Sequence, residues 1–146
     1  MRWITREHPR VDRVACPWLI QRFIDAAAEF VYVAADAVLA EAKARDATAF
    51  DVPGVHLGRK GSECSFDAFV HTYRLADDPA LIHLARIVRA ADTGRPDLAP
   101  EALGFEAILE GVRVIHFPND QEQRAASVPI MEALYAYCRE RAATSP

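Results

Sequence analysis

Hydrophobic residues in the first third of the chain alternate between strand-like and helix-like spacing. Residues 2–6 (RWITR) and 29–33 (EFVYV) are short runs rich in β-branched and aromatic residues, which is typical of strands. Between them, apolar residues over 18–24 recur at helical spacing directly after Pro17, and proline is favoured at the first position of a helix. The pattern predicts a strand, a helix that starts at Pro17, and a second strand.

The alternation continues to residue 52. Asp36 has the character of a helix N-cap, and Val38 and Leu39 are expected to face inward in the helix that follows it. Residues 48–52 (TAFDV) predict a third strand, which the next Pro-Gly pair ends. Because right-handed crossovers join successive parallel strands, this βαβαβ order predicts a small, mostly parallel sheet of about three strands.

The other two thirds of the chain have a mainly helical pattern. A glycine-rich loop covers residues 54–64, and Ser65 begins a helix with an apolar stripe. The Asp78-Pro79 pair is a strong start for the next helix, which is expected to continue to Asp92.

Three further predictions concern the C-terminal part of the chain. A helix over residues 100–110 is expected to end at Gly111, because glycine commonly caps helix C-termini. Residues 112–117 fit either a strand or a continuing helix. A capping-box pattern begins at Asn119, and Pro129 is expected to divide the segment after it into two helices.

Length and composition suit an ordinary globular protein. With 146 residues, the chain is predicted to be a single α/β domain over residues 1–146, with a frayed tail at 142–146. No apolar run approaches the roughly 18 residues that a membrane span needs. The N-terminus has no apolar segment typical of a secretory signal, so we expect a cytoplasmic protein with reduced cysteines.

The charge is unevenly distributed. The net charge is −4, which argues against direct nucleic-acid binding by this chain alone, because duplex binding depends on neutralising phosphates. Residues 1–25 contain five arginines and three acidic residues, so this segment carries +2 and the rest of the chain carries −6. A basic segment on an acidic body suits a small anion better than a long polyanion.

Residues 10–25 (RVDRVACPWLIQRFID) are the strongest candidate for a binding site. The charged and thiol residues in this run either pair with one another or hold a ligand: they are Arg10, Asp12, Arg13, Cys16 and Arg22. If Cys16 stands at the start of the predicted helix, the helix dipole would lower the pKa of its thiol and make it reactive. The alternative is a buried cysteine that fills core space beside Trp18.

Five potential metal ligands surround the glycine-rich loop, beyond the end of the third predicted strand, where open α/β sheets place their sites. They are Asp51, His56, Glu63, Cys64 and Asp67. A divalent metal is therefore one candidate cofactor, and the cofactor is otherwise unknown. The spacing matches no established zinc pattern, and the positive charges of Arg59 and Lys60 would repel a cation. In the structural alternative, Asp51 caps a turn and Cys64 lies in the core.

Asp92 is expected at the C-terminal end of a helix, where an acidic residue opposes the helix dipole. It should therefore have a partner, either an arginine of the N-terminal cluster or a bound cation. We favour a salt bridge over a catalytic role for this residue.

Several segments resemble the C-terminal domain of the ChrB chromate-resistance family: TREHPRVDRVACPWLIQRFID, FDVPGV, CSFDAF, IVRAADTGR and ALYAYCR. The resemblance covers nearly the whole chain, and its D-R-x-x-C-P-W-L-I-x-R-F-I-D run is specific. It implies a cytoplasmic protein that acts in chromate resistance, in sensing or regulation, with chromate reduction also proposed for the family. Family members often carry histidine in the loop before CSF, and sometimes before the Asp92 position, where this chain has Arg59 and Arg89. If those histidines are metal ligands, their replacement implies loss of the metal; if the pocket holds an oxyanion, the arginines fit it.

The leading hypothesis is one pocket that binds a small anion such as chromate, or a metal. Its lining is predicted to be Arg10, Asp12, Arg13, Cys16, Arg22, Asp51, Cys64 and Asp92. The second hypothesis is a thiol-dependent chromate reductase with Cys16 as its catalytic residue, although no resolving cysteine or dinucleotide fingerprint accompanies it. The third is an interaction module without a small-molecule site. No N-terminal DNA-binding segment is recognisable, so we expect a homo-oligomer or a DNA-binding partner protein.

Overall fold

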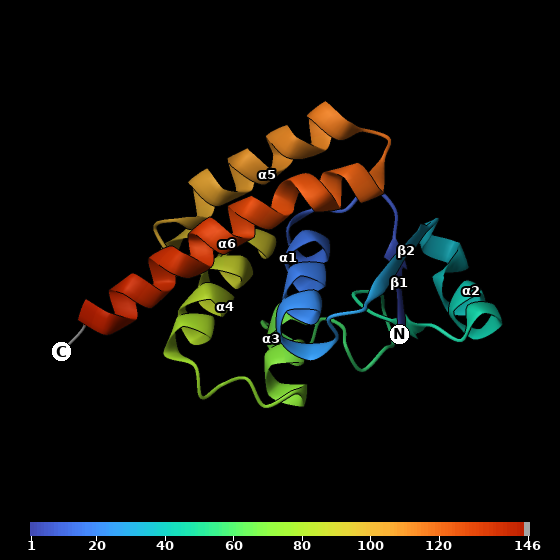
Figure 1. Ribbon diagram of the computed structural model, residues 1–146, viewed down its shortest axis with the longest axis horizontal. Helices are drawn as coiled ribbons and strands as arrows, with labels where there is room; N and C mark the ends of the chain where they lie inside the picture. The colour runs from blue at the N-terminus through green and yellow to red at the C-terminus, as the bar shows by residue number, and fades with distance from the viewer. Residues whose placement is uncertain (145–146) are drawn as a thin grey trace.

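The computed structural model describes residues 1–144, and a three-stranded parallel sheet lies in its N-terminal third (Figure 1). The central strand is β1 (Arg2–Arg6), which pairs with β2 (Glu29–Val33) on one side and β3 (Thr48–Ala49) on the other. Every pairing is parallel, so the predicted sheet is confirmed.

Both faces of the sheet are covered. Ile4 packs with Val38 and Val52 in a small cluster on the side of α2 (Val38–Arg45). On the opposite face, Trp3 belongs to the main core, which the other helices share. Because every residue of β1 from Trp3 to Thr5 is buried, this strand shows no polar face.

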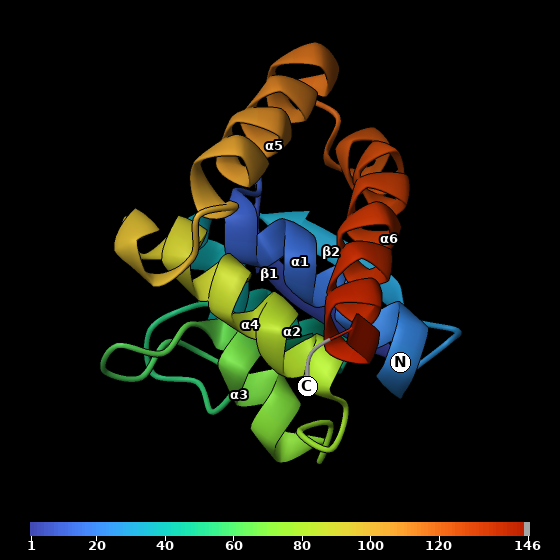
Figure 2. The same cartoon turned by 90° about the vertical axis from the view of Figure 1, so that its left-hand side faces the viewer.

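The rest of the chain is mainly helical, as predicted. Besides α2, the helices are α1 (Val11–Leu19), α3 (Ser65–Thr72), α4 (Pro79–Asp92), α5 (Ala102–His116) and α6 (Asp120–Thr144). A π-helical turn at Ile20–Ile24 extends α1, and short 3₁₀ turns occur at Ala35–Ala37 and Pro96–Leu98. Figure 2 shows α5 and α6 lying over α1 and α4.

The predicted start of the first helix is wrong. The helix begins at Val11 rather than Pro17, and Pro17 lies inside it. Val11 and Val14 are both buried and extend the apolar stripe of the helix by more than one turn toward the N-terminus. Core packing of these residues outweighs the hydrogen bond that proline cannot donate.

Two predictions around the second helix are also wrong. Asp36 does not cap it but lies in the 3₁₀ turn before it, and Leu39 is 58% exposed while Val38 is buried. The third strand stops at Ala49 instead of residue 52. The reason is that Asp51 adopts a left-handed backbone conformation, with φ of 51°, which takes the chain out of the sheet.

The helix expected to end at Gly111 continues through it to His116, so residues 112–117 are almost entirely helical. Gly111 does not adopt the positive φ of a C-terminal cap, whereas three other glycines do. The boundary prediction failed because glycine was taken as a stop signal in a segment that is helical on both sides.

Pro129 does not divide the last helix, since α6 is continuous from Asp120 to Thr144. Pro129 and Ala125 are both exposed, so water can satisfy the carbonyl of Ala125 that the proline leaves without its N–H partner. The predicted frayed tail is helical over 142–144, and Ser145 and Pro146 lie outside the described residues.

The other helix starts follow the prediction. The Asp78 carboxylate accepts a hydrogen bond from the backbone N–H of Ala80 at 2.8 Å, and Asn119 accepts one from Glu122 at 3.0 Å. None of the helices described over residues 1–144 is both long enough and apolar enough to span a membrane.

Candidate functional site

Asp12 joins the N-termini of two helices. Its carboxylate accepts hydrogen bonds from the backbone N–H of Ser65 at 2.6 Å and of Phe66 at 3.0 Å. These are donors of the first turn of α3, which have no partner within their own helix. The Cys16 thiol also donates to Asp12, at 3.5 Å. Asp12, on α1, therefore caps α3 from 53 residues away in sequence.

The Cys-Ser-Phe-Asp run is a second capping device at the same place. Cys64 is the N-cap residue of α3, and its backbone N–H donates to Asp67 at 3.0 Å. The Cys64 thiol donates to the same oxygen at 3.3 Å. The other oxygen of Asp67 accepts a hydrogen bond from Arg89 of α4 at 2.7 Å. This run therefore ties α3 to α4 and has a clear structural role.

Asp51 lies between two guanidinium groups, just beyond β3. One of its oxygens accepts a hydrogen bond from the Ser65 hydroxyl at 2.7 Å. The other lies 3.7 Å from Nη1 of Arg13 and 4.0 Å from Nη2 of Arg6. Both of these separations exceed normal hydrogen-bond length, so Asp51 lies near the two guanidinium groups without accepting a hydrogen bond from either.

Asp92 ends α4 beside the N-terminus of α1. It pairs with Arg59 of the glycine-rich loop, so the predicted arginine partner exists but comes from a different segment. Burial raises the pKa of Asp92, while Arg59 and the backbone N–H of Asp12 act in the opposite direction. This carboxylate thus links α4, the loop and the first turn of α1.

The structure brings together six of the eight residues predicted to form one pocket. They are Asp12, Arg13, Cys16, Asp51, Cys64 and Asp92. The guanidinium groups of Arg10 and Arg22 pair elsewhere, although Arg10 lines a small separate hollow together with Asp92. Arg10 points toward α5 and pairs with Glu110 at 3.3 Å. Arg22 lies at the far end of the first helix, more than two turns from Arg13.

The Cys-Pro-Trp segment anchors the first helix to α6. Trp18 donates its indole N–H to Glu132 at 2.9 Å, and Arg22 donates to the same oxygen at 2.8 Å. The guanidinium of Arg22 also lies over the rings of Phe23 and Tyr135. The C-terminal half of the run that carries the family resemblance therefore has a packing role.

The predicted pocket lining left out three arginines of the charged cluster: Arg6 was not singled out at all, and Arg59 and Arg89 were considered as anion ligands only through the family resemblance. Arg6 ends β1, and the carboxyl ends of parallel strands are where α/β sheets place their sites. That rule could have identified Arg6. The positions of Arg59 and Arg89 depend on loop and helix packing, for which the sequence carries no local signal.

The five predicted metal ligands do not converge on one point. His56 hydrogen bonds with Thr72 at 3.1 Å, and Glu63 pairs with His71 at 3.7 Å. Asp51 and Asp67 have the separate partners described above. Across residues 1–144, no three His, Cys, Asp or Glu side chains form a group that could hold a metal ion.

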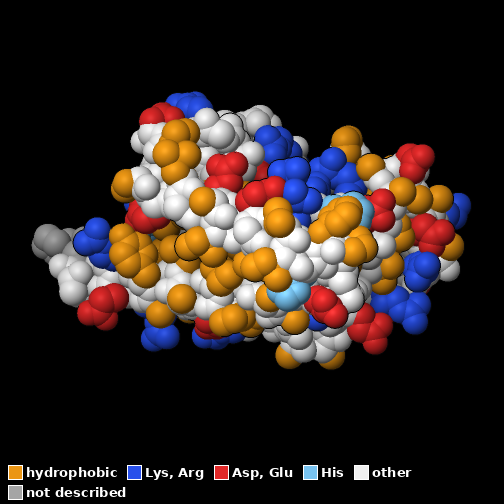
Figure 3. All heavy atoms as spheres, turned by 90° about the horizontal axis from the view of Figure 1, so that it is seen from above, with side chains coloured by type: hydrophobic (Ala, Val, Ile, Leu, Met, Phe, Trp, Pro, Cys, Tyr) orange, Lys and Arg blue, Asp and Glu red, His pale blue; other side chains and the backbone are white. Residues whose placement is uncertain are grey.

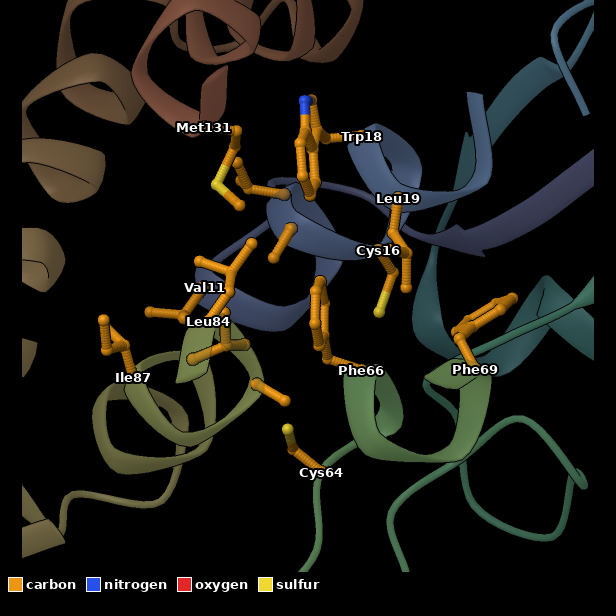
Figure 4. Packing of buried hydrophobic residues seen from close by; sticks show 14 of the residues in the cluster. Val11, Cys16, Trp18, Leu19, Cys64, Phe66, Phe69, Leu84, Ile87 and Met131 are labelled. Atoms are coloured by element: carbon orange, nitrogen blue, oxygen red, sulfur yellow. The ribbon is translucent and has the colours of Figure 1, made fainter. Parts of the chain in front are cut away.

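The predicted acidic thiol is contradicted. Because the helix begins at Val11, Cys16 lies inside α1 rather than at its N-terminus, and its side chain is fully buried (Figure 4). Burial raises the pKa of the Cys16 thiol well above its usual range, and the nearby Asp12 carboxylate adds to the effect. Burial raises the pKa of Cys64 in the same way. The alternative of core cysteines is confirmed for both residues.

The raised pKa of Asp12 predicts that the stability of the folded protein depends on pH. Burial, followed by the charges of Asp51 and Asp92, raises its pKa from 3.8 to about 8. The folded protein thus binds this proton more tightly than the unfolded chain, so its stabilising effect is full below about pH 4 and declines toward about pH 8. In urea unfolding, wild type should lose stability relative to Asp12→Asn across this range. A difference that does not change with pH would contradict the prediction.

A hollow opens beside this cluster, at the carboxyl ends of β1 and β3. It has a volume of about 430 Å³, and its lining includes Arg6, Asp51 and Arg59. Arg13 does not line the hollow but lies on the buried side of Asp51, 3.7 Å from its carboxylate. The Nε atoms of Arg6 and Arg13 are buried and have no hydrogen-bond partner. Guanidinium groups with free donors are suited to binding an oxyanion by paired hydrogen bonds.

The charge balance of the cluster also favours an anion. Three guanidinium groups, from Arg6, Arg13 and Arg59, face the carboxylates of Asp51 and Asp92. Asp12 adds little negative charge at neutral pH, because its pKa is raised to about 8. One positive charge is therefore left over near the hollow.

Comparison with known proteins gives a consistent result. The family model described as "ChrB, C-terminal domain" matches residues 3–138. The curated relative "Protein ChrB" from Cupriavidus metallidurans is 36% identical over 135 residues, which is 92% of this chain and 40% of that protein. The chain thus spans less than half the length of this relative. No solved structure matches the chain.

Proposed function

The chain belongs to the family of ChrB C-terminal domains, and on that premise we propose that it binds a small tetrahedral oxyanion such as chromate in a sensing or regulatory role. Family membership links the chain to chromate resistance. The observation that carries the binding proposal is the hollow lined by Arg6 and Arg59, beside the Nε atoms of Arg6 and Arg13, which are buried without a hydrogen-bond partner. A cytoplasmic location is part of the same proposal.

The loose contacts of Asp51 explain how an anion enters. Its pairings with Arg6 and Arg13 are long, so an anion oxygen in the hollow can approach the Nη atoms of Arg6 without first breaking a short hydrogen bond. A dianion also gains more than a carboxylate from guanidinium groups in a partly buried site, because the effective dielectric constant there is lower than in water.

The same geometry suggests how binding is transmitted. Arg59 lines the hollow and at the same time holds Asp92 at the end of α4. An anion that attracts Arg59 therefore competes with Asp92. The loop and the α4 terminus are the segments whose positions would change on binding, which is the kind of differential contact that sensing needs.

Arginine substitution tests the binding site directly. Arg6→Gln should weaken chromate binding at least about tenfold, because it removes a charged donor from the hollow. Arg2→Gln is the matched control, since Arg2 lies on the same strand at its other end and pairs with Glu29. Calorimetric titration with chromate, and with sulfate as a second tetrahedral dianion, measures both. Equal affinity of the two variants would overturn the proposed site.

A further inference from the structure

The outer face of α5 is apolar along the whole helix. Four of its large side chains are between 55% and 75% exposed: Leu103, Ile108, Val114 and Ile115. Ala102, Phe105 and Leu109 fill the opposite face, which packs on the core. Figure 3 looks onto α5 and α6 and shows hydrophobic side chains gathered on this side of the molecule. A surface helix normally turns polar residues to solvent, so this face lacks a partner among the described residues.

Small residues form a valley between the large ones. Helical periodicity places Gly104, Ala107 and Gly111 along one line, with Leu103 and Val114 on one side and Ile108 and Ile115 on the other. Glycine inside a helix weakens it relative to alanine. A Cβ atom added at Gly104 or Gly111 would meet no atom within 4 Å. Contacts within the described chain therefore give no reason for either glycine.

A closely approaching helix would explain both observations. Small residues let two helix backbones come near each other, and the large residues beside the valley then pack against the neighbouring helix. The face of α5 supplies a valley and two ridges at once, so it is complementary to another copy of itself. Such a self-complementary surface is what a twofold interface requires.

The available area agrees with a dimer. The exposed parts of the four large side chains amount to roughly 400 Å² of apolar surface. Stable interfaces bury about 800 Å² per partner. The adjoining groove between α5 and α6 supplies more apolar surface, because Ile108 lines it together with Ile130, Leu134 and Tyr137.

We propose that two copies of this chain associate through the outer face of α5, with Gly104, Ala107 and Gly111 at the closest approach of the two helices. The proposal does not depend on the anion site, because no residue of α5 lines that hollow.

Sedimentation equilibrium over micromolar to several hundred micromolar protein tests the proposal. Wild type should be a dimer over most of that range. A protein that stays monomeric throughout would overturn the proposal. The apolar face would then be left for another protein or a lipid surface.

Substitution of the two glycines gives the sharper test. Gly104→Ala/Gly111→Ala should raise the dimer dissociation constant at least about tenfold, because the added methyl groups keep the helices apart. The thermal unfolding midpoint of the dilute monomer should rise, because alanine favours the helix and each methyl group has free space. Unchanged dimerisation of this variant would contradict the predicted close contact.

A charge placed on the outer face of α5 provides an independent test. Ile115→Lys should give a monomer, whereas Leu39→Lys should leave the association of wild type unchanged. Both side chains are more than half exposed, but Leu39 lies on α2, away from α5. Dimerisation of the Ile115→Lys variant at wild-type strength would exclude the proposed interface.

Discussion

Replacing Asp12 with alanine should lower the free energy of unfolding by about 3 kcal/mol. The substitution removes the acceptor for two backbone N–H groups at the start of α3 and for the Cys16 thiol, all of them buried. An unsatisfied buried donor costs about 1–3 kcal/mol. The relief from burying a charge offsets little of this, because a raised pKa already leaves the carboxyl largely protonated at neutral pH.

Urea unfolding of purified variants measures this loss. Asp12→Asn should cost less than Asp12→Ala, because it keeps one acceptor oxygen at the same place. Asp97→Ala is the control, since Asp97 is exposed and pairs only with Arg95 two residues earlier, so its loss should change stability by less than about 0.5 kcal/mol. If Asp12→Ala were as stable as the control, the capping role of Asp12 would be refuted.

The sheet and most helices could be predicted because their signals are local. Alternating β-formers mark β1 and β2, and Asp78-Pro79 marks the start of α4. Proline and glycine misled the prediction at Pro17, Gly111 and Pro129. At these positions, packing of neighbouring apolar residues, or water at an exposed carbonyl, outweighs a local preference that is worth only a few kcal/mol.

The candidate site could be predicted only in part, because some of its members have local sequence signals and others do not. Asp12 and Arg13 were identified because charges crowded at an apolar helix need an explanation, and Asp51 because it follows the third predicted strand. The structure shows all three as close neighbours. Arg22 was wrongly grouped with them because nearness in sequence does not mean nearness on a helix. Arg59 was considered as a charge that repels metal and as an arginine that suits an oxyanion, but its pairing with Asp92 was not predicted. The partner of a loop residue depends on tertiary packing.

The thiols of the native protein should react with a thiol reagent at least about 10³ times more slowly than those of the unfolded chain. Cys16, Cys64 and Cys138 are all fully buried, and burial raises the pKa of each thiol. A reagent can therefore reach them only when the protein opens, and the unfolded fraction of a stable domain is about 10⁻³ or less. Thiolate is also scarce at pH 8, because burial disfavours its charge.

This prediction bears directly on the reductase hypothesis, which needs a thiolate that donates electrons to chromate. Stopped-flow modification in buffer and in guanidinium chloride measures the ratio, and Ala35→Cys, with Ala35 exposed, supplies the rate of an accessible thiol in the folded protein. Cys16→Ser should then leave chromate binding in place, because the hollow is lined by guanidinium groups and not by sulfur. Rapid modification of Cys16 in the native protein, with loss of thiol on addition of chromate, would instead support thiol chemistry over binding.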